Sequence, residues 1–277
     1  MRETKAEYLP IEKLRPFEDH PFKVEDNAEM DQLVESILAQ GVLMPLVVRP
    51  LESGEYEVIS GHRRLRACKK AGLDSVPAIV AAMDRDAATI AMVDSNLHRE
   101  HILPSEKAFA YKLKAEAMHH QGRTSGQVGQ KWTRDEVANG ESGRQVQRYI
   151  RLTHLIPKIL QMVDDGKIAL TPAVEISYLT KLEQADLLET MECEDCTPSL
   201  SQAMQLKQMS QAGELDMDTI FSILTQLKPN QQEKISFKVS ELRSYFPRSY
   251  TASQMTRDIL KGLELLRQRR EQNRDSR

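Results

Sequence analysis

The fold is decided by residues 55–79, EYEVISGHRRLRACKKAGLDSVPAI, where alternating apolar and polar residues lead into a glycine and then a cluster of arginines. The alternation is typical of a β-strand, and Gly61 supplies a tight turn. The next segment predicts a helix that buries Leu65 and Cys68, before a second strand-like run at residues 76–80. We therefore expect a strand, a turn, a helix and a strand, in this order.

Three arginines, Arg63, Arg64 and Arg66, stand at the start of this predicted helix. A helix start presents unpaired N–H groups and a partial positive charge, so arginines are poorly placed there unless an anion is bound. Gly61 lets the backbone approach a ligand closely, and the arrangement suits a phosphate group. The alternative is a solvated basic helix, because charged runs usually lie on the surface.

The surrounding sequence has the same alternation of short strands and short helices. Asn27 can cap a helix that ends at Gly41, and strand-like runs follow at residues 45–49 and 56–59. From Asp84 onward the pattern is mostly helical. The chain is therefore expected to be α+β, with a small α/β domain followed by a mostly helical region.

Composition narrows the functional classes. The 277 residues carry a formal net charge of −3, so any contact with nucleic acid must come from local basic patches. Cys193 and Cys196 have the spacing of half a zinc site, but no second pair accompanies them. No window approaches the roughly 20 apolar residues of a membrane span, so we expect a soluble, cytoplasmic protein without a membrane partner.

Two capping patterns follow one another in the helical region, Thr133-x-x-Glu136 and Ser142-x-x-Gln145. They frame a short helix, a turn at residues 139–140 and a longer helix through Arg151, which is the pattern of a helix-turn-helix over about residues 133–152. Arginine and glutamine are the side chains that read guanine and adenine edges in the major groove. The predicted DNA-binding residues are those left on the outer face: Arg144, Gln145, Gln147, Arg148 and Arg151.

Three boxes in this order resemble a known family. Residues 61–67, GHRRLRA, are similar to the Gly-Glu-Arg-Arg-x-Arg-Ala box of ParB-type partition proteins. The run from Ser36 to Arg49 resembles the helix and strand ahead of that box, and Asn96-x-x-Arg99-Glu100 resembles a later one. The resemblance is greatest to the versions found on plasmids and integrative mobile elements.

The resemblance implies an N-terminal domain with the ParB/sulfiredoxin fold that binds CTP with Mg²⁺. By this resemblance Asn96 would reach the metal ion and Arg99 a phosphate. The full set of predicted nucleotide-binding residues is Gly61, His62, Arg63, Arg64, Arg66, Asn96 and Arg99. No catalytic residue is assigned.

Three positions depart from the family pattern. His62 and Ser95 stand where the boxes usually have glutamate, and Met44 replaces a glutamine. Hydrolysis needs a positioned, partly deprotonated water, for which a carboxylate is suited and a serine is not. We therefore expect nucleotide binding with weak or absent CTPase activity. His62 has two open interpretations, a base or a hydrogen-bond donor to phosphate.

The predicted organisation has three parts: residues 1–100 for the nucleotide-binding domain, 101–195 for the helical DNA-binding domain and 196–277 for a smaller helical region. A final helix after Thr251 has an apolar stripe, which suits either ordinary core packing or a homodimer contact. The family resemblance implies double-stranded DNA and a ParA-type ATPase as partners, and a location on the nucleoid.

The leading hypothesis is a partition protein that binds a centromere-like DNA site. A second hypothesis is a transcriptional regulator of a mobile element with a vestigial nucleotide site, which the missing glutamates favour. A third is a phosphotransferase or nuclease on the same scaffold, although no carboxylate cluster that could hold a catalytic metal accompanies the boxes.

Overall fold

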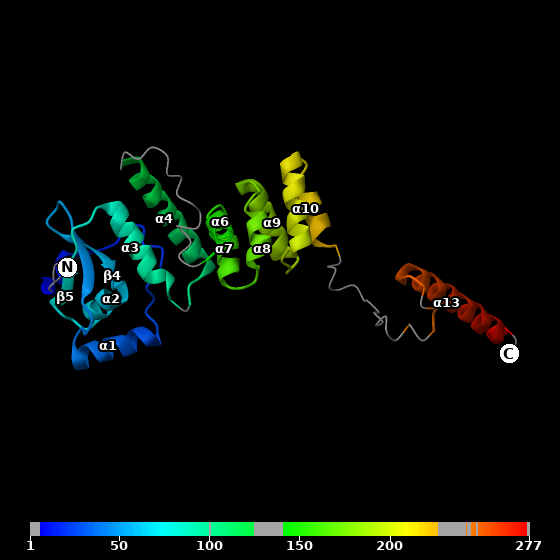
Figure 1. Cartoon of the computed structure of the whole chain (residues 1–277), viewed down its shortest axis with the longest axis horizontal. Coiled ribbons are helices and arrows are strands. Elements are labelled where there is room, and N and C mark those ends of the chain that lie inside the picture. Colours follow the sequence, from blue (N-terminus) through cyan, green and yellow to red (C-terminus); the bar gives the residue numbers. More distant parts are fainter. Residues whose placement is uncertain are drawn as a thin grey trace. The chain divides into compact units, whose positions relative to one another are not determined.

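The computed structural model describes residues 6–99, 101–124, 141–226, 242, 245–247 and 249–275. The chain divides into two compact units, residues 1–226 and 227–277. The first unit begins with a mixed five-stranded sheet and continues as helices (Figure 1). The strands are β1 (Glu7–Pro10), β2 (Leu14–Pro16), β3 (Leu46–Pro50), β4 (Tyr56–Ser60) and β5 (Ser75–Val80).

Both faces of the sheet are covered. Along β4, Val58 packs into the core formed with helices α1 (Ala28–Gln40) and α2 (His62–Lys70), whereas the next residue, Ile59, packs with α3 (Arg85–Leu97). This alternation follows from the two-residue period of a strand. The predicted small α/β domain is therefore confirmed, and the structure adds that helices cover both faces of its sheet.

The strand order is β1-β5-β3-β4-β2, so the first two strands lie at opposite edges of the sheet. Only the 3₁₀ turn η1 (Ile11–Lys13) separates them. Since a chain advances at most about 3.6 Å per residue, these two edges must lie close together and the sheet must curl strongly. The alternation in this part of the sequence does not reveal this turn, which the Ile11 N–H stabilises by donating to the Asp74 carbonyl at 2.9 Å.

The helices after α3 share a second core, and α4 also packs with α3 through Ala110. They are α4 (Pro104–Thr124), α6 (Gly143–Leu152), α7 (Pro157–Asp164), α8 (Leu170–Ile176), α9 (Lys181–Cys193), α10 (Leu200–Ala212) and α11 (Met217–Leu224). Residues of α10 and α11, which the sequence analysis grouped with the C-terminal region, pack with α6 to α9 around Leu152, Ile176 and Leu206. The second unit contains α13 (Ala252–Asp275).

Candidate functional site

The arginine box lies where β4 turns into α2. Gly61 is the N-cap of α2 and has a φ of +105°, a backbone conformation that favours glycine. A Cβ at this position would lie 3.0 Å from the Leu46 side chain and 3.1 Å from an Arg64 guanidinium nitrogen. The turn therefore requires glycine both for its backbone conformation and for the close approach of β3.

Each arginine of the box has a partner within the protein. The Arg63 guanidinium lies 3.1 Å from the Glu29 carboxylate, and Arg66 lies 2.6 Å from Asp26. The Arg66 hydrogen bond lowers the pKa of the Asp26 carboxyl. Both pairs are solvent-exposed, and such pairs contribute little to stability and exchange partners readily.

Arg64 has a different role from its two neighbours. Its guanidinium is half-buried and donates to the carbonyl of Pro45 at 2.8 Å and to that of Met44. Burial lowers the pKa of this guanidinium. Arg64 thus fixes the segment that leads into β3, and of the three arginines it is the one bound to backbone instead of to a carboxylate.

The later box meets the arginine box in space. Asn96 is buried in the last turn of α3 and donates from Nδ2 to the Met92 carbonyl at 2.8 Å. Arg99 follows just after the helix, with its guanidinium 5.5 Å from the centre of the Phe22 ring. Desolvation lowers the pKa of the Arg99 guanidinium, and the positive charge of Arg63 lowers it further.

Arg99 is the arginine of the site without a polar partner. Its backbone N–H donates to the Asn96 carbonyl at 3.1 Å, but its guanidinium forms no hydrogen bond or ion pair within the described part of the chain. A guanidinium has five N–H donors, and because the Arg99 side chain is exposed these donors are open to a ligand. Its environment, with Arg63 nearby, therefore favours the arrival of an anion such as a phosphate group.

His62 lies beneath this site. Its Nε2 accepts a hydrogen bond from the Phe17 N–H at 3.2 Å, and its ring centre lies 3.8 Å from that of His20. Burial, together with the nearby His20 and Arg99, lowers the pKa of His62 to about 3. The ring is thus neutral at physiological pH, and the nitrogen bound to Phe17 serves as an acceptor.

The predicted DNA-binding residues lie on α6, whose start matches the second capping pattern. The Ser142 hydroxyl accepts from the Gln145 N–H at 3.3 Å. Arg144 and Gln147 are exposed. Arg148 donates to the Gln145 side-chain oxygen Oε1 at 3.2 Å, which joins these two side chains.

Arg151 is anchored at the end of α6. It donates to the Ser177 hydroxyl at 3.1 Å and to the Ser177 carbonyl at 2.8 Å, and it stacks 4.0 Å from the centre of the Tyr178 ring. It therefore holds α6 against the turn after α8. The predicted first helix of the helix-turn-helix, after Thr133, lies outside the described residues.

Comparison with known proteins identifies the first part of the chain. The family model of the ParB N-terminal domain matches residues 1–97. These residues are therefore similar to ParB N-terminal domains. The chain is also 37% identical over 181 residues to the chromosome-partitioning protein Spo0J of Thermus thermophilus, covering 65% of this chain and 61% of that protein. This chain therefore spans less than two thirds of that relative's length.

Other relatives carry related names. A probable chromosome-partitioning protein ParB of Vibrio cholerae is 27% identical over 261 residues, covering 93% of this chain and 84% of that protein. A C-terminally truncated ParB of Caulobacter crescentus, solved with the centromeric parS site, has a TM-score of 0.45 and 23% identity over 80% of this chain and 100% of that chain. The truncated Caulobacter crescentus ParB has also been solved with CTP-gamma-S. That structure has a TM-score of 0.32 and 27% identity, covering 68% of this chain and 98% of that chain. These TM-scores are too low for residue positions to be transferred.

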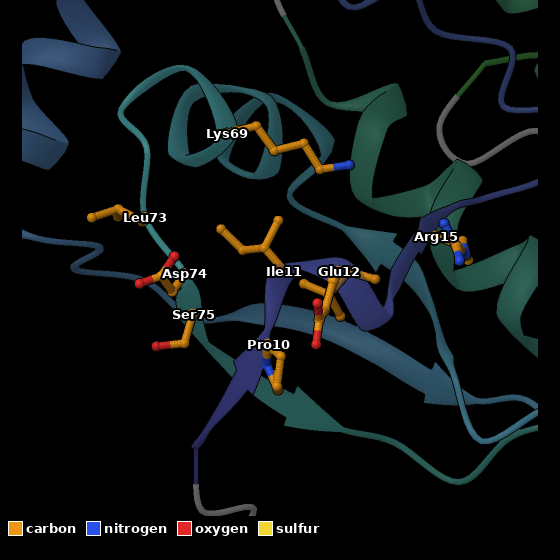
Figure 2. Close-up of a pocket in the computed structure, with 9 residues that line it drawn as sticks. Pro10, Ile11, Glu12, Arg15, Lys69, Leu73, Asp74 and Ser75 are labelled. Carbon is orange, nitrogen blue, oxygen red and sulfur yellow. The ribbon is translucent and has the colours of Figure 1, made fainter.

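Two cavities lie near the N-terminal α/β domain but away from its arginine box. One, of about 690 Å³, lies at the seam between β1 and β2, below Lys69 and beside Ile11 and Asp74 (Figure 2). The other, of about 650 Å³, lies between the loop that holds His20 and helices α4 and α7. No arginine of the box lines either cavity.

Two residues of the site escaped the sequence analysis. His20 packs on His62, and its buried Nε2 has no hydrogen-bond partner among the described residues. Glu106, in the first turn of α4, accepts from the Lys23 N–H at 2.7 Å. Both reach the site from segments far from the arginine box in sequence. A glutamate in the first turn of a helix is expected to accept a backbone N–H at the start of that helix, as Glu106 does from Leu103. The same position does not predict the contact of Glu106 with Lys23.

The described residues offer little for a metal ion or a membrane. No group of three or more His, Cys, Asp or Glu side chains among them could hold a metal ion. None of the described helices is long and apolar enough to cross a bilayer. The C-terminal helix α13 has exposed Leu260, Leu263 and Leu266, which continue the apolar stripe noted in the sequence.

Proposed function

We propose that this chain is a ParB-type partition protein that binds a centromere-like DNA site through α6 and a nucleotide at the ParB N-terminal domain. The unpaired Arg99 guanidinium beside Arg63 carries the nucleotide part of this proposal. Two boxes that are far apart in the sequence meet at the loop of residues 17–23, since Arg99 lies 5.5 Å from the centre of the Phe22 ring and the His62 ring lies 3.8 Å from that of His20. Guanidinium groups bind phosphate through charge-assisted, often bidentate hydrogen bonds.

CTP is the nucleotide that the family resemblance implies, with its phosphates at Arg63 and Arg99. The surface pairs of Arg63 with Glu29 and of Arg66 with Asp26 would open to admit them. Arg64 and Gly61 would keep the turn in place, because both are fixed by contacts with the segment before β3 and with β3 itself. His62, a neutral acceptor bound to the Phe17 N–H, would position this turn and leave phosphate to the arginines.

Mg²⁺ would accompany the nucleotide, with the Asn96 side-chain oxygen as its proposed protein ligand. The Asn96 amide nitrogen is already committed to the Met92 carbonyl, which leaves the oxygen as the group that can bind a cation. One amide oxygen makes a weak metal site by itself. We therefore derive no catalytic step through a metal ion.

The chain's own carboxylates argue for weak or absent hydrolysis. Asp94 pairs with Lys114 at 2.7 Å, and Glu106 accepts two backbone N–H groups. Ser95, which stands where the family has glutamate, donates to the Met92 carbonyl at 2.9 Å. None of these groups is free to activate a water, so the site is suited to binding.

Titration calorimetry with CTP at millimolar Mg²⁺ tests the nucleotide proposal. We expect wild-type protein to bind and Arg99→Gln to lose most of that binding. Arg15→Gln is a matched control, because Arg15 is an exposed, ion-paired arginine of the same domain. No heat with wild-type protein, or equal loss in both variants, would end the claim. Rapid phosphate release would end the claim of weak hydrolysis.

For DNA recognition, the exposed Arg144 and Gln147 are the side chains free to reach base edges, and Gln145 and Arg148 would act as a pair. Footprinting on the chain's own operon and origin region is the test. We expect Gln147→Ala to relax or abolish a specific footprint, whereas Arg151→Ala should mainly destabilise α6. Protection that is unaffected by Gln147→Ala would contradict this assignment.

The remaining parts of the proposal concern assembly. Homodimerisation would use the exposed leucines of α13, and a ParA-type ATPase would be the partner for movement on the nucleoid. We place the chain with the versions encoded by plasmids or integrative elements. Sedimentation of Leu263→Glu against wild type tests the dimer contact, and a ParA-type gene in the same operon would support the partner.

A transcriptional regulator is the second candidate, because Arg63, Arg64 and Arg66 all have partners within the protein. A regulator should protect only its operator, with or without nucleotide. A partition protein should extend its protection when nucleotide is present. A phosphotransferase or nuclease finds no support in the side chains around Arg99.

A further inference from the structure

The turn after α8 carries a half-exposed aromatic ring on a fixed backbone. Ser177 and Leu179, on either side of Tyr178, are both buried, and the Tyr178 N–H donates to the Glu175 carbonyl at 3.2 Å. The Tyr178 side chain itself is 43% exposed, so burial in the core does not account for its position. The ring must therefore serve the groups that it contacts.

Two cations from different helices share the Tyr178 ring. The Arg151 guanidinium of α6 lies 4.0 Å from the ring centre, and the Lys207 ammonium of α10 lies 3.8 Å from it. The negative face of an aromatic ring attracts cations, and the attraction is stronger where water is partly excluded. The Tyr178 ring therefore links α10 to α6, although Arg151 and Lys207 are far apart in the sequence.

Each of the two cations also has a second partner on or just after α8. Lys207 lies 2.8 Å from the Glu175 carboxylate, which offsets part of the repulsion between two neighbouring positive charges. Arg151 donates to the hydroxyl and the carbonyl of Ser177, and the Ser177 hydroxyl donates to the Val174 carbonyl at 2.6 Å. These contacts form one connected group that ties α10, α8 and α6 together.

Arg151 belongs to the stripe of α6 that would read DNA. It follows Gln147 by four residues and Arg144 by seven, and residues at these spacings lie on the same face of a helix. A contact that fixes the Arg151 guanidinium therefore also limits the rotation of α6 about its own axis. The direction in which Gln147 and Arg144 project depends on that rotation.

We infer that Tyr178 and Lys207 are positioning residues for DNA recognition: together they hold Arg151 and thereby set the orientation of the reading face of α6. The inference rests on the DNA recognition proposed for α6 and adds the part played by α10. Lys207 lies beyond residue 195, where the sequence analysis ended the DNA-binding domain. A side chain from outside that segment thus acts on the helix that reads DNA.

Paired substitutions in the full chain test this role through binding to a DNA fragment that carries the footprinted site. Tyr178→Leu removes the ring and Lys207→Met removes the ammonium, and each should weaken binding about fivefold, the order expected for a partly desolvated contact between a cation and a ring. Tyr178→Phe and Lys207→Arg keep the ring and the cation and should bind as wild type does. Lys158→Met is a matched control, because Lys158 is an ion-paired lysine of the same helical region, beside Glu192. It should also bind as wild type does.

The double variant separates positioning from a direct contact with a phosphate. Because the two side chains act through one ring, Tyr178→Leu combined with Lys207→Met should lose no more affinity than Tyr178→Leu alone. The salt dependence of binding should keep its wild-type slope in every variant. Losses that multiply, or a slope lowered by about one in Lys207→Met, would mean that Lys207 binds a phosphate itself and would overturn the inference.

Hydrogen exchange on the free protein tests the same contacts without DNA. Tyr178→Leu and Lys207→Met should each speed amide exchange in α6 about fivefold and leave α7, which shares the same core, unchanged. Unchanged exchange in α6, or equal acceleration in α6 and α7, would overturn the inference even if the chain binds its DNA site. A wild-type chain that prefers no DNA site would overturn the recognition proposed for α6, and with it the role of these two residues in recognition.

Discussion

Replacement of Gly61 by alanine should destabilise the N-terminal α/β domain more than an ordinary glycine substitution. The backbone at Gly61 has a φ of +105°, and the left-handed region costs a non-glycine residue about 1–2 kcal/mol. The new Cβ would also lie 3.0 Å from Leu46, which is fully buried and cannot move aside freely. Crowding of this kind costs about 1–3 kcal/mol, so we expect a total of about 3 kcal/mol.

Gly72 is a suitable control, because its φ is +72° and nothing lies within 4 Å of a Cβ placed there. Gly72→Ala should therefore lose only the backbone contribution, about 1 kcal/mol. Urea unfolding followed by circular dichroism gives both free energies, provided that the slope with denaturant stays constant. A loss for Gly61→Ala equal to or smaller than that for Gly72→Ala would refute the close approach of Leu46.

Three further predictions follow from buried polar contacts. The pKa of His62 in the folded chain is about 3, below its usual value, so near pH 5 the unfolded chain binds a proton that the native chain does not. The free energy of unfolding should therefore fall by about 2 kcal/mol between pH 6.5 and pH 5. The fall should be smaller in His62→Gln. Asp94→Asn should cost about 2 kcal/mol by leaving the buried Lys114 ammonium unpaired, as measured by urea unfolding. Gln202→Leu should cost about 3 kcal/mol in the same assay, because the buried amide donates to carbonyls at the end of α11, the nearest at 2.8 Å; a loss below about 1 kcal/mol would contradict this role.

Local chemistry allowed much of the fold to be predicted. The caps at Asn27, Asp84 and Ser142 each accept the expected backbone N–H, and the helices after them begin where predicted. The strand and helix around Gly61 are also confirmed, because a glycine of this kind and an alternating run act over a few residues. The position of the arginine box at the start of a helix followed from the same short-range pattern.

Long-range contacts decided the rest of the site. The curl of the sheet, which brings the edges at β1 and β2 together, cannot be read from either strand alone. The ion-pair partners of Arg63 and Arg66 could not be predicted from the arginine box either, because Glu29 and Asp26 come from the start of α1. An ion pair leaves no periodic signal in the sequence of either partner.

The sequence by itself determined which residues carry charge near the turn at Gly61 and that this turn opens a helix, because capping, glycine conformation and amphipathic period are properties of neighbouring residues. Only the tertiary structure decided which guanidinium stays unpaired. The Arg99 guanidinium lies over the Phe22 ring without a carboxylate partner among the described residues, because α3 and α4 pack against the loop of residues 17–23. Such contacts depend on how helices that are far apart in the sequence pack together, so the sequence of one segment does not predict them.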